Sequence, residues 1–274
     1  MPITYYVDYP CEVKELVPPG RMLRLLYGME RANEAMNKAR KTDPAALASA
    51  VKVSLSLKGR DRTGQLKVAT VAEVTEQFSE LGKLAARCDG CRARIESIAF
   101  GCRSRIDFPF SMKAEALLMS RIHDSHGDPS GSMLCNYLEN NGITGNKPAE
   151  MRNLPGVFFE SDKPLVRRLE DGRRISSNQI FELLFLTEQI SPNHCRFLLG
   201  MLDMLEPRLP LDRDLSGLPN LFVVQREELG MPVARVGLKL TRSDDEDDCT
   251  HQLIGFFGAL LFGTEYQNSV WVKV

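Results

Sequence analysis

The chain has 274 residues, of which 43% are hydrophobic and 26% are charged. Its 35 Lys and Arg residues stand against 36 Asp and Glu residues, which gives a formal net charge of −1. These values are close to the averages of soluble globular proteins. They exclude a disordered chain, a collagen-like fibre and a strongly basic nucleic-acid coat. The length is sufficient to bury a large core, in one large domain or two small ones.

Cysteine usage and the first residues indicate a compartment. Seven cysteines cannot all pair within one chain, and the opening segment carries Asp8 without the apolar run of a secretory signal. We therefore expect a reducing, cytoplasmic environment. The longest apolar stretch, Leu253 to Phe262, is about half as long as a bilayer-spanning helix. We expect no membrane partner.

Strands and helices alternate in the first part of the chain. β-branched and aromatic residues predict a strand over 3–7. Apolar residues recur at helical spacing from Met22 and predict a helix that ends before Thr42. Alternating apolar and polar residues over 51–57 predict a second strand, which returns as a third over 65–71.

The next two segments complete a known order. Helical spacing over 74–86 is followed by a β-rich stretch over 95–106. The order β-α-β-β-α-β is that of a ferredoxin-like fold, so we expect residues 1–110 to form one sheet with both helices on one face. The fold predicts architecture and leaves activity open.

From residue 111 the pattern becomes mainly helical. Two helices are predicted between Ser177 and Leu205, the first capped by Ser176 or Ser177 and the second by Ser191, with Pro192 at its first position. Both are apolar nearly all round, so we expect them to be buried as an antiparallel pair.

The tail predicts a β-hairpin, with strands over 221–226 and 233–240, and a last strand over 270–274. The fold class is thus α+β. A ferredoxin-like region, 1–110, would contain a zinc-knuckle-like cysteine insertion. A helical and β-hairpin region, 111–274, would follow it, either separate or packed as one domain with the first.

Cysteines provide the strongest chemical signal. Cys88 and Cys91 have the Cys-x-x-Cys spacing, and Cys102 follows eleven residues later. Such a group at a helix end resembles a structural zinc site, which needs four ligands. Cys11 is our first choice for the fourth ligand, and His123 or His126 the second. An iron–sulfur cluster, a redox thiol pair and ordinary buried cysteines remain open alternatives.

A second candidate is the loop that holds His123 and His126. Together with Asp124 and Asp128 these imidazoles could bind a metal or act as acid and base, and Cys135 could pair with either as a nucleophile. No HExxH motif accompanies them, and a helix end with a Gly-Asp-Pro turn explains the same residues.

Basic residues gather twice, at 87–105 and at 163–174. The first cluster contains Arg87, Arg92, Arg94, Arg103 and Arg105, and the second Lys163, Arg167, Arg168, Arg173 and Arg174. Either could contact phosphates and make the chain a nucleic-acid-binding module. No recognisable pattern of aromatic residues interleaves with them, so solvated, salt-bridged faces are the favoured interpretation.

Together these observations favour a non-enzymatic cytoplasmic binding or scaffold protein with a protein partner and a structural zinc ion. A nucleic-acid-binding module that uses the two arginine clusters is the first alternative. An enzyme centred on the His123/His126 loop is the second.

Overall fold

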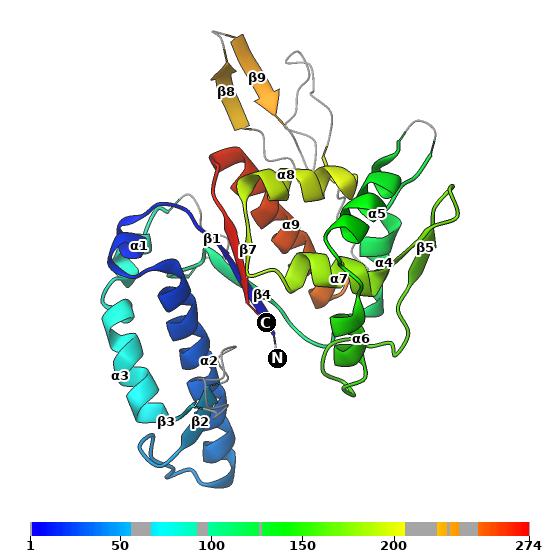
Figure 1. Cartoon of the computed structure of the whole chain (residues 1–274). Helices are drawn as coiled ribbons and strands as arrows, with labels where there is room; N and C mark the ends of the chain where they lie inside the picture. The colour runs from blue at the N-terminus through cyan, green and yellow to red at the C-terminus, as the bar shows by residue number, and fades with distance from the viewer. Residues whose placement is uncertain are drawn as a thin grey trace. The chain divides into compact units, whose positions relative to one another are not determined.

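Helices and strands are mixed in the computed structural model, with 52% of the chain helical and 16% in strands, which confirms the α+β class. The structure describes residues 2–55, 67–91, 98–125, 128–205, 224–228, 231–235 and 246–273. It forms two compact units (Figure 1): residues 10–101 make one, and residues 1–9 with 102–274 make the other. The boundary expected from the sequence, between 1–110 and 111–274, stays a prediction.

The larger unit is built on a four-stranded antiparallel sheet in the order β4-β1-β10-β7. Its strands are β1 (Ile3–Val7), β4 (Arg103–Ile106), β7 (Gln189–Ile190) and β10 (Val270–Lys273). Every residue of β1 is buried. Its continuous run of β-branched and aromatic residues suits this central position between two neighbouring strands.

One face of this sheet packs against α9 (Asp248–Tyr266). The Tyr5 ring meets the Phe256 ring edge-on, with centroids 5.0 Å apart. The other helices of the unit surround a large apolar core. They are α4 (Met112–Ser120), α5 (Ser130–Asn140), α6 (Asn146–Arg152), α7 (Ser177–Phe185) and α8 (Pro192–Met201).

The two helices predicted between Ser177 and Leu205 are α7 and α8. Ser176 caps α7 through a capping box with Gln179, and Ser191 caps α8 with Pro192 at its first position. In the structure, α7 and α8 pack mainly against other helices instead of forming the expected antiparallel pair. α7 packs against α6 and α4, while α8 packs against α9 and α5. Both helices are apolar on more than one side, so several neighbours can bury them.

Two small hairpins complete the described part of this unit. β5 (Val166–Arg168) pairs with β6 (Arg174–Ser176), and β8 (Val224–Glu228) pairs with β9 (Met231–Arg235). The predicted C-terminal hairpin is therefore confirmed, although the rest of its predicted range lies outside the described residues.

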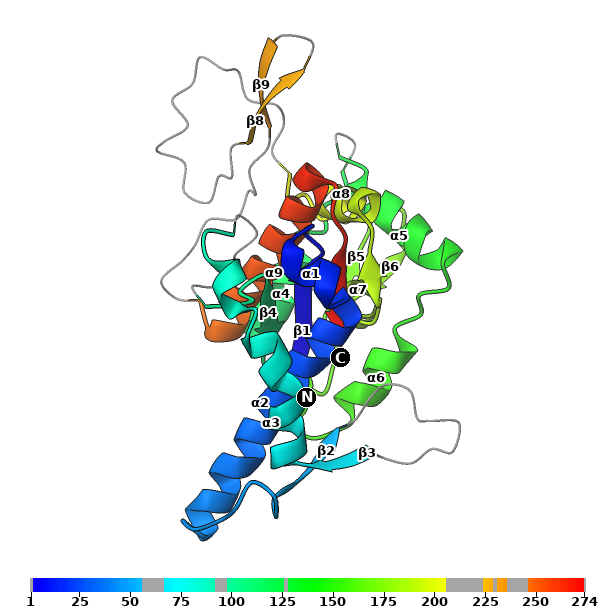
Figure 2. The same ribbon diagram turned by 90° about the vertical axis from the view of Figure 1, so that its left-hand side faces the viewer.

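The described residues of the smaller unit, 10–101, form three helices, a 3₁₀ turn and a β-hairpin. In Figure 1 and Figure 2 the long helix α2 runs beside α3. The elements are α1 (Glu12–Leu16), α2 (Pro19–Thr42), β2 (Lys52–Leu55), β3 (Lys67–Thr70), α3 (Val71–Gly82) and the 3₁₀ turn η1 (Ala85–Cys88). The predicted pairing of 51–57 with 65–71 is confirmed by the β2–β3 hairpin.

The ferredoxin-like sheet is not confirmed. The predicted order of elements is present, but β2 and β3 pair with each other in a separate sheet, while β1 lies between β4 and β10. A local core explains this difference, because Val53 of β2 and Ala69 of β3 are buried with Ala32, Met36 and Val74 of the two helices. One of the two strands beside β1, β10, comes instead from the far end of the chain.

No described helix combines the length and the apolar run that crossing a bilayer requires.

Candidate functional site

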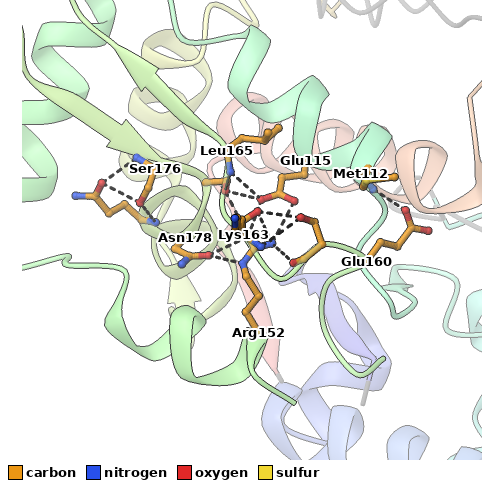
Figure 3. A network of polar contacts seen from close by, with 11 residues as sticks. Met112, Glu115, Arg152, Glu160, Lys163, Leu165, Ser176 and Asn178 are labelled. Atoms are coloured by element: carbon orange, nitrogen blue, oxygen red, sulfur yellow. Dashed lines mark hydrogen bonds and ion pairs between the residues drawn. The ribbon is translucent and has the colours of Figure 1, made fainter. Parts of the chain in front are cut away.

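A buried ion pair lies between α4 and α6 of the larger unit (Figure 3). Arg152 Nη2 donates to Glu115 Oε1 at 2.6 Å and Nη1 to Oε2 at 3.3 Å, so the two groups meet in a bidentate geometry. Each side chain is 1% exposed. Removing two charges from water is costly, so such a pair is retained only where further hydrogen bonds satisfy it.

The remaining donors of Arg152 are used on its other side. Nε and Nη2 donate to Asn178 Oδ1 of α7, at 3.1 and 2.9 Å. Nη1 donates to the carbonyl of Ser161 at 2.7 Å and more weakly to that of Lys163 at 3.4 Å. The guanidinium carbon also lies 3.6 Å from the centroid of the Phe159 ring, a cation–π contact. The loop at 159–163 is thereby fixed to the helices.

Glu115 fixes the next residues of the same loop. Its Oε1 accepts from the hydroxyl of Ser177 and, at 3.4 Å, from the backbone N–H of Leu165. Ser177 Oγ in turn accepts from the N–H of Leu165 at 2.9 Å. Leu165 directly precedes β5, so the buried pair positions the entry to the β5–β6 hairpin.

Local sequence explains how α6 presents Arg152. Gly145 precedes the helix with a φ of +77°, a conformation that favours glycine, and a Cβ there would approach the Asn178 Cβ to 3.0 Å. The Gly145 N–H also donates to Glu182 Oε2 of α7 at 2.7 Å. The close approach lets α6 lie against α7 with Arg152 beside Asn178.

The hairpin carries arginines on its surface. In the register of the ladder, Arg168 of β5 stands directly opposite Arg174 of β6. Residues directly opposite each other share a face of the sheet, so two guanidinium groups of like charge are neighbours there. Arg167 points to the other face, opposite the buried Ile175.

Three of these arginines have no counter-ion among the described residues. Arg167, Arg168 and Arg174 are exposed, and within the described residues no carboxylate forms an ion pair with any of them. Arg173 differs, since its Nε lies 2.6 Å from Asp171 Oδ2 and its Nη1 lies 3.5 Å from Glu139 Oε2. We call Arg167, Arg168 and Arg174 the hairpin arginines. Lys163, the other base of the predicted cluster, is exposed in the loop before β5.

Asp124 holds the loop of the hairpin. One of its oxygens accepts from the Glu170 N–H at 2.9 Å, and the other accepts from the hydroxyl and the N–H of Ser132 at 2.8 and 3.2 Å. These bonds, first of all the one from Glu170, hold the pKa of Asp124 below its usual value. Asp124 therefore ties the hairpin loop to the first turn of α5.

The proposed His123/His126 centre is not brought together in the described residues. His123 Nε2 lies 3.6 Å from Asp203 Oδ2, and its carbonyl accepts from Gly131 N at 2.6 Å. Asp128 Oδ1 accepts from the Ser130 N–H at 3.1 Å. His126 lies outside the described residues. The described groups of this loop thus bind backbone and neighbouring side chains.

The thiol of Cys135 is not an activated nucleophile. It is buried and donates to Glu139 Oε1 at 3.3 Å. Burial, together with this hydrogen bond, raises its pKa to about 11. A nucleophilic cysteine requires the opposite shift.

Cys88 and Cys91 lie on a tight turn in the smaller unit. The Cys91 N–H donates to the Cys88 carbonyl at 3.2 Å. Asp89 has φ −67° and ψ 128°, and Gly90 has φ +73°. These are the values of a type II turn, which needs glycine or asparagine at its third position. The turn brings the two cysteines of the motif to its two ends.

Cys11 lies in the same unit, and Cys102 belongs to the other. Cys11 and Cys88 pack against one small core that includes Val13 and Leu81. α1, which Cys11 precedes, contacts η1, and Glu12 and Arg87 form an ion pair of 2.8 Å across them. The Cys102 carbonyl accepts from the Val7 N–H at 3.3 Å.

In the described ranges, no three His, Cys, Asp or Glu side chains form a group that could hold a metal ion. The structure therefore brings Cys88 and Cys91 to one turn and packs Cys11 on the same small core as Cys88, and four ligands are not assembled among the residues that it describes. The segment 92–97, between Cys91 and Cys102, lies outside the described residues.

The first arginine cluster is divided between the two units. Arg87 pairs with Glu12, Arg105 Nε lies 3.1 Å from Asp107 Oδ1, and Arg92 and Arg94 lie outside the described residues. Arg103 stands opposite Tyr6 in the central sheet.

Aromatic rings accompany these bases on the sheet. Tyr6 stands opposite Trp271 on its other side, and the two rings are parallel within 7° at 6.5 Å. Tyr6 is only 1% exposed, however, so its ring offers no open surface on which nucleobases could stack. These rings come from opposite ends of the chain, which is why the sequence does not show them beside the arginines.

Sequence reasoning missed Glu115, Arg152 and Asn178. Each is a polar residue on a helix, and for Arg152 and Asn178 nothing in the local pattern distinguishes the residue from a solvated side chain. One signal was available: Glu115 lies between Ala114 and Leu118 within an apolar stripe, where a charge requires a partner.

Comparisons of the chain with protein-family models, with curated proteins and with solved structures find no match.

Proposed function

We propose that the chain is a non-enzymatic binding or scaffold protein that recognises an acidic protein partner through the hairpin arginines. The observation that carries this proposal is a set of three exposed arginines, for which the described residues provide no ion-pair partner, on a hairpin fixed by a buried ion pair. Like charges placed directly opposite each other cost stability, and an anionic partner would offset that cost.

The surroundings of Cys135 and Asp124, two candidate catalytic residues, also support a binding role. Cys135 has a raised pKa, and Asp124 is occupied by the backbone of Glu170 and by Ser132. We place the protein in the cytoplasm, as expected from its free cysteines.

The test uses charge reversal. The triple variant R167E/R168E/R174E should lose binding to fluorescein-labelled poly-glutamate, measured by anisotropy. The control R24E/K38E/R40E changes the same number of exposed bases on α2 and should bind as the unmodified protein does. Equal binding by both variants would overturn the proposal. Preference for a single-stranded oligonucleotide over poly-glutamate would support the nucleic-acid alternative instead.

We further propose that a structural zinc ion binds the two cysteines of the Cys88–Cys91 turn, with Cys11 of the same unit as a further ligand. Cys102, the remaining ligand predicted from the sequence, belongs to the larger unit. What supports this is the type II turn and the packing of Cys11 and Cys88 on one core. Thiolates are among the preferred ligands of a tetrahedral zinc ion.

Metal analysis of protein purified without chelator tests the zinc site. We expect about one zinc ion per chain. Cys88→Ser, Cys91→Ser and Cys11→Ser should each lower it, while Cys195→Ser, in the other unit, should not. Folded protein that contains neither zinc nor iron would show that these cysteines are ordinary thiols without a metal.

A further inference from the structure

The outer edge of β5 is free in the described structure. The sheet formed by β5 and β6 has two strands, so each strand pairs on one side. Ser177 N donates to the Leu165 carbonyl at one end of the ladder, and Leu169 N donates to the Arg173 carbonyl at the other. In an antiparallel ladder the hydrogen-bonded pairs alternate with non-bonded pairs.

This alternation fixes which groups point outward. Positions 165, 167 and 169 face β6 with their N–H and C=O groups, so those of Val166 and Arg168 point to the open edge. In the described part of the chain, no hydrogen-bond partner is found for either N–H. The edge therefore offers two donors and two acceptors in a row.

The side chains on this edge are exposed and mixed in character. Val166 is 56% exposed and shares its face with Arg168, while Arg167 lies on the opposite face and is also exposed. Because Arg168 and Arg174 form a non-bonded pair, their side chains are at the closer of the two cross-strand spacings.

We infer that β5 is a docking edge on which an extended acidic segment of a partner protein adds as a third strand. The inference rests on the proposed function and names the form of its partner. In strand addition the main-chain hydrogen bonds supply affinity, and side chains at alternate positions supply specificity. An antiparallel segment would place acidic residues opposite Arg168 and Arg167, followed by an apolar residue opposite Val166.

The buried ion pair gives the edge its rigidity. Leu165, one residue before the edge, is held by Ser177 and Glu115, and the carbonyls of Ser161 and Lys163 are held by Arg152. An edge already held in its extended form loses little conformational entropy when a partner strand adds to it.

Charged residues on a short edge strand also have a simpler explanation, since they discourage unwanted strand pairing. That explanation predicts that no extended peptide binds this edge. The two interpretations therefore separate by experiment.

The probe is a fluorescein-labelled peptide of about ten residues with the core Thr-Glu-Glu-Val-Thr, whose length spans a short strand pair. We expect binding to slow the amide hydrogen exchange of Val166 and Arg168 at least about tenfold, because their N–H groups would become bonded. Unchanged exchange at both positions in the bound state would overturn strand addition.

A matched pair of variants separates the backbone from the charge. Val166→Pro removes the outward N–H and retains all three hairpin arginines, and proline is tolerated at an edge where the N–H faces solvent. Val166→Thr retains the N–H. We expect Val166→Pro to weaken peptide binding by about tenfold or more and Val166→Thr to have little effect. Circular dichroism and thermal unfolding establish that both variants are folded.

The outcomes also distinguish the two proposals. Binding that is lost on reversal of the hairpin arginines but retained by Val166→Pro would overturn strand addition and leave the proposed function standing. Binding retained by both would overturn both. An oligonucleotide bound more tightly than the peptide, with the same arginine dependence, would overturn the choice of a protein partner.

Discussion

Arg152 and Glu115 lie 37 residues apart in the sequence, and their charged groups meet at 2.6 Å where each side chain is 1% exposed. Their hydrogen bonds reach α7 through Asn178 and the approach to β5 through Leu165. The pair is thus the point at which three helices and the surface hairpin are joined. Its role is to position the hairpin.

Removing one partner of this ion pair should strongly destabilise the folded protein. Arg152→Met leaves the Glu115 carboxylate buried without its cation, and we expect a loss of about 3–5 kcal/mol in the free energy of unfolding. The double variant E115L/R152M removes both charges, so it should be less destabilised than Arg152→Met. Urea unfolding of both proteins measures the difference. A double variant less stable than Arg152→Met would contradict this account.

Replacing one of the hairpin arginines should raise stability and weaken binding of the acidic peptide at the same time. Arg174→Glu places a carboxylate directly opposite Arg168, which replaces repulsion by attraction and should raise stability by about 0.2–1 kcal/mol. The same change should weaken binding of the acidic peptide. Urea midpoints and anisotropy titrations measure the two effects. Loss of stability together with unchanged binding would show that the two guanidinium groups do not face a common anion.

Local patterns predicted most of the elements. The alternation at 51–57 and 65–71 gave the β2–β3 hairpin, and Ser191 with Pro192 gave the start of α8. These features depend on residues within one or two turns of one another, so the sequence displays them directly.

The arrangement of the sheets depended on distant contacts. β10, near the end of the chain, lies beside β1, and the apolar sides of β2 and β3 are buried against α2 and α3. No local pattern states which strand occupies a neighbouring position. The hairpin arginines were visible as a basic cluster, but only the register shows Arg168 opposite Arg174 and only the structure shows Arg173 already paired.

Acidification should loosen the loop of the hairpin. The pKa of Asp124 is lowered in the folded chain, so its ionised form contributes stability that is present above the unfolded value of 3.8 and is lost as pH falls through the lower folded value. Asp124→Asn should therefore be less stable than the unmodified protein at pH 7, with the difference shrinking below about pH 4. Amide exchange of Glu170, whose N–H binds Asp124, reports the change. A stability difference that grows as pH falls would contradict this linkage.

Three cysteines of the larger unit should be inert. Burial, as the largest cause, raises the pKa of Cys135 and Cys249 to about 11 and that of Cys195 to about 12. At pH 8 these thiols stay protonated, and thiols react as thiolates. Mass spectrometry after brief iodoacetamide treatment of the native protein should find them unmodified. Rapid alkylation of Cys135 in the native protein would revive the enzyme alternative.

The turn at Cys88–Cys91 offers the sharpest test of the zinc proposal. Gly90 has a φ of +73°, and a Cβ at this position would meet nothing within 4 Å. Gly90→Ala therefore strains the backbone without a clash, at a cost of about 1–2 kcal/mol, while Gly90→Asn is tolerated in the same conformation. If the turn presents both thiolates to zinc, Gly90→Ala should bind zinc about tenfold more weakly and Gly90→Asn nearly as well as the unmodified protein. Competition with a chromogenic chelator measures both affinities. Equal zinc affinity in the alanine and asparagine variants would show that zinc binding does not depend on this turn.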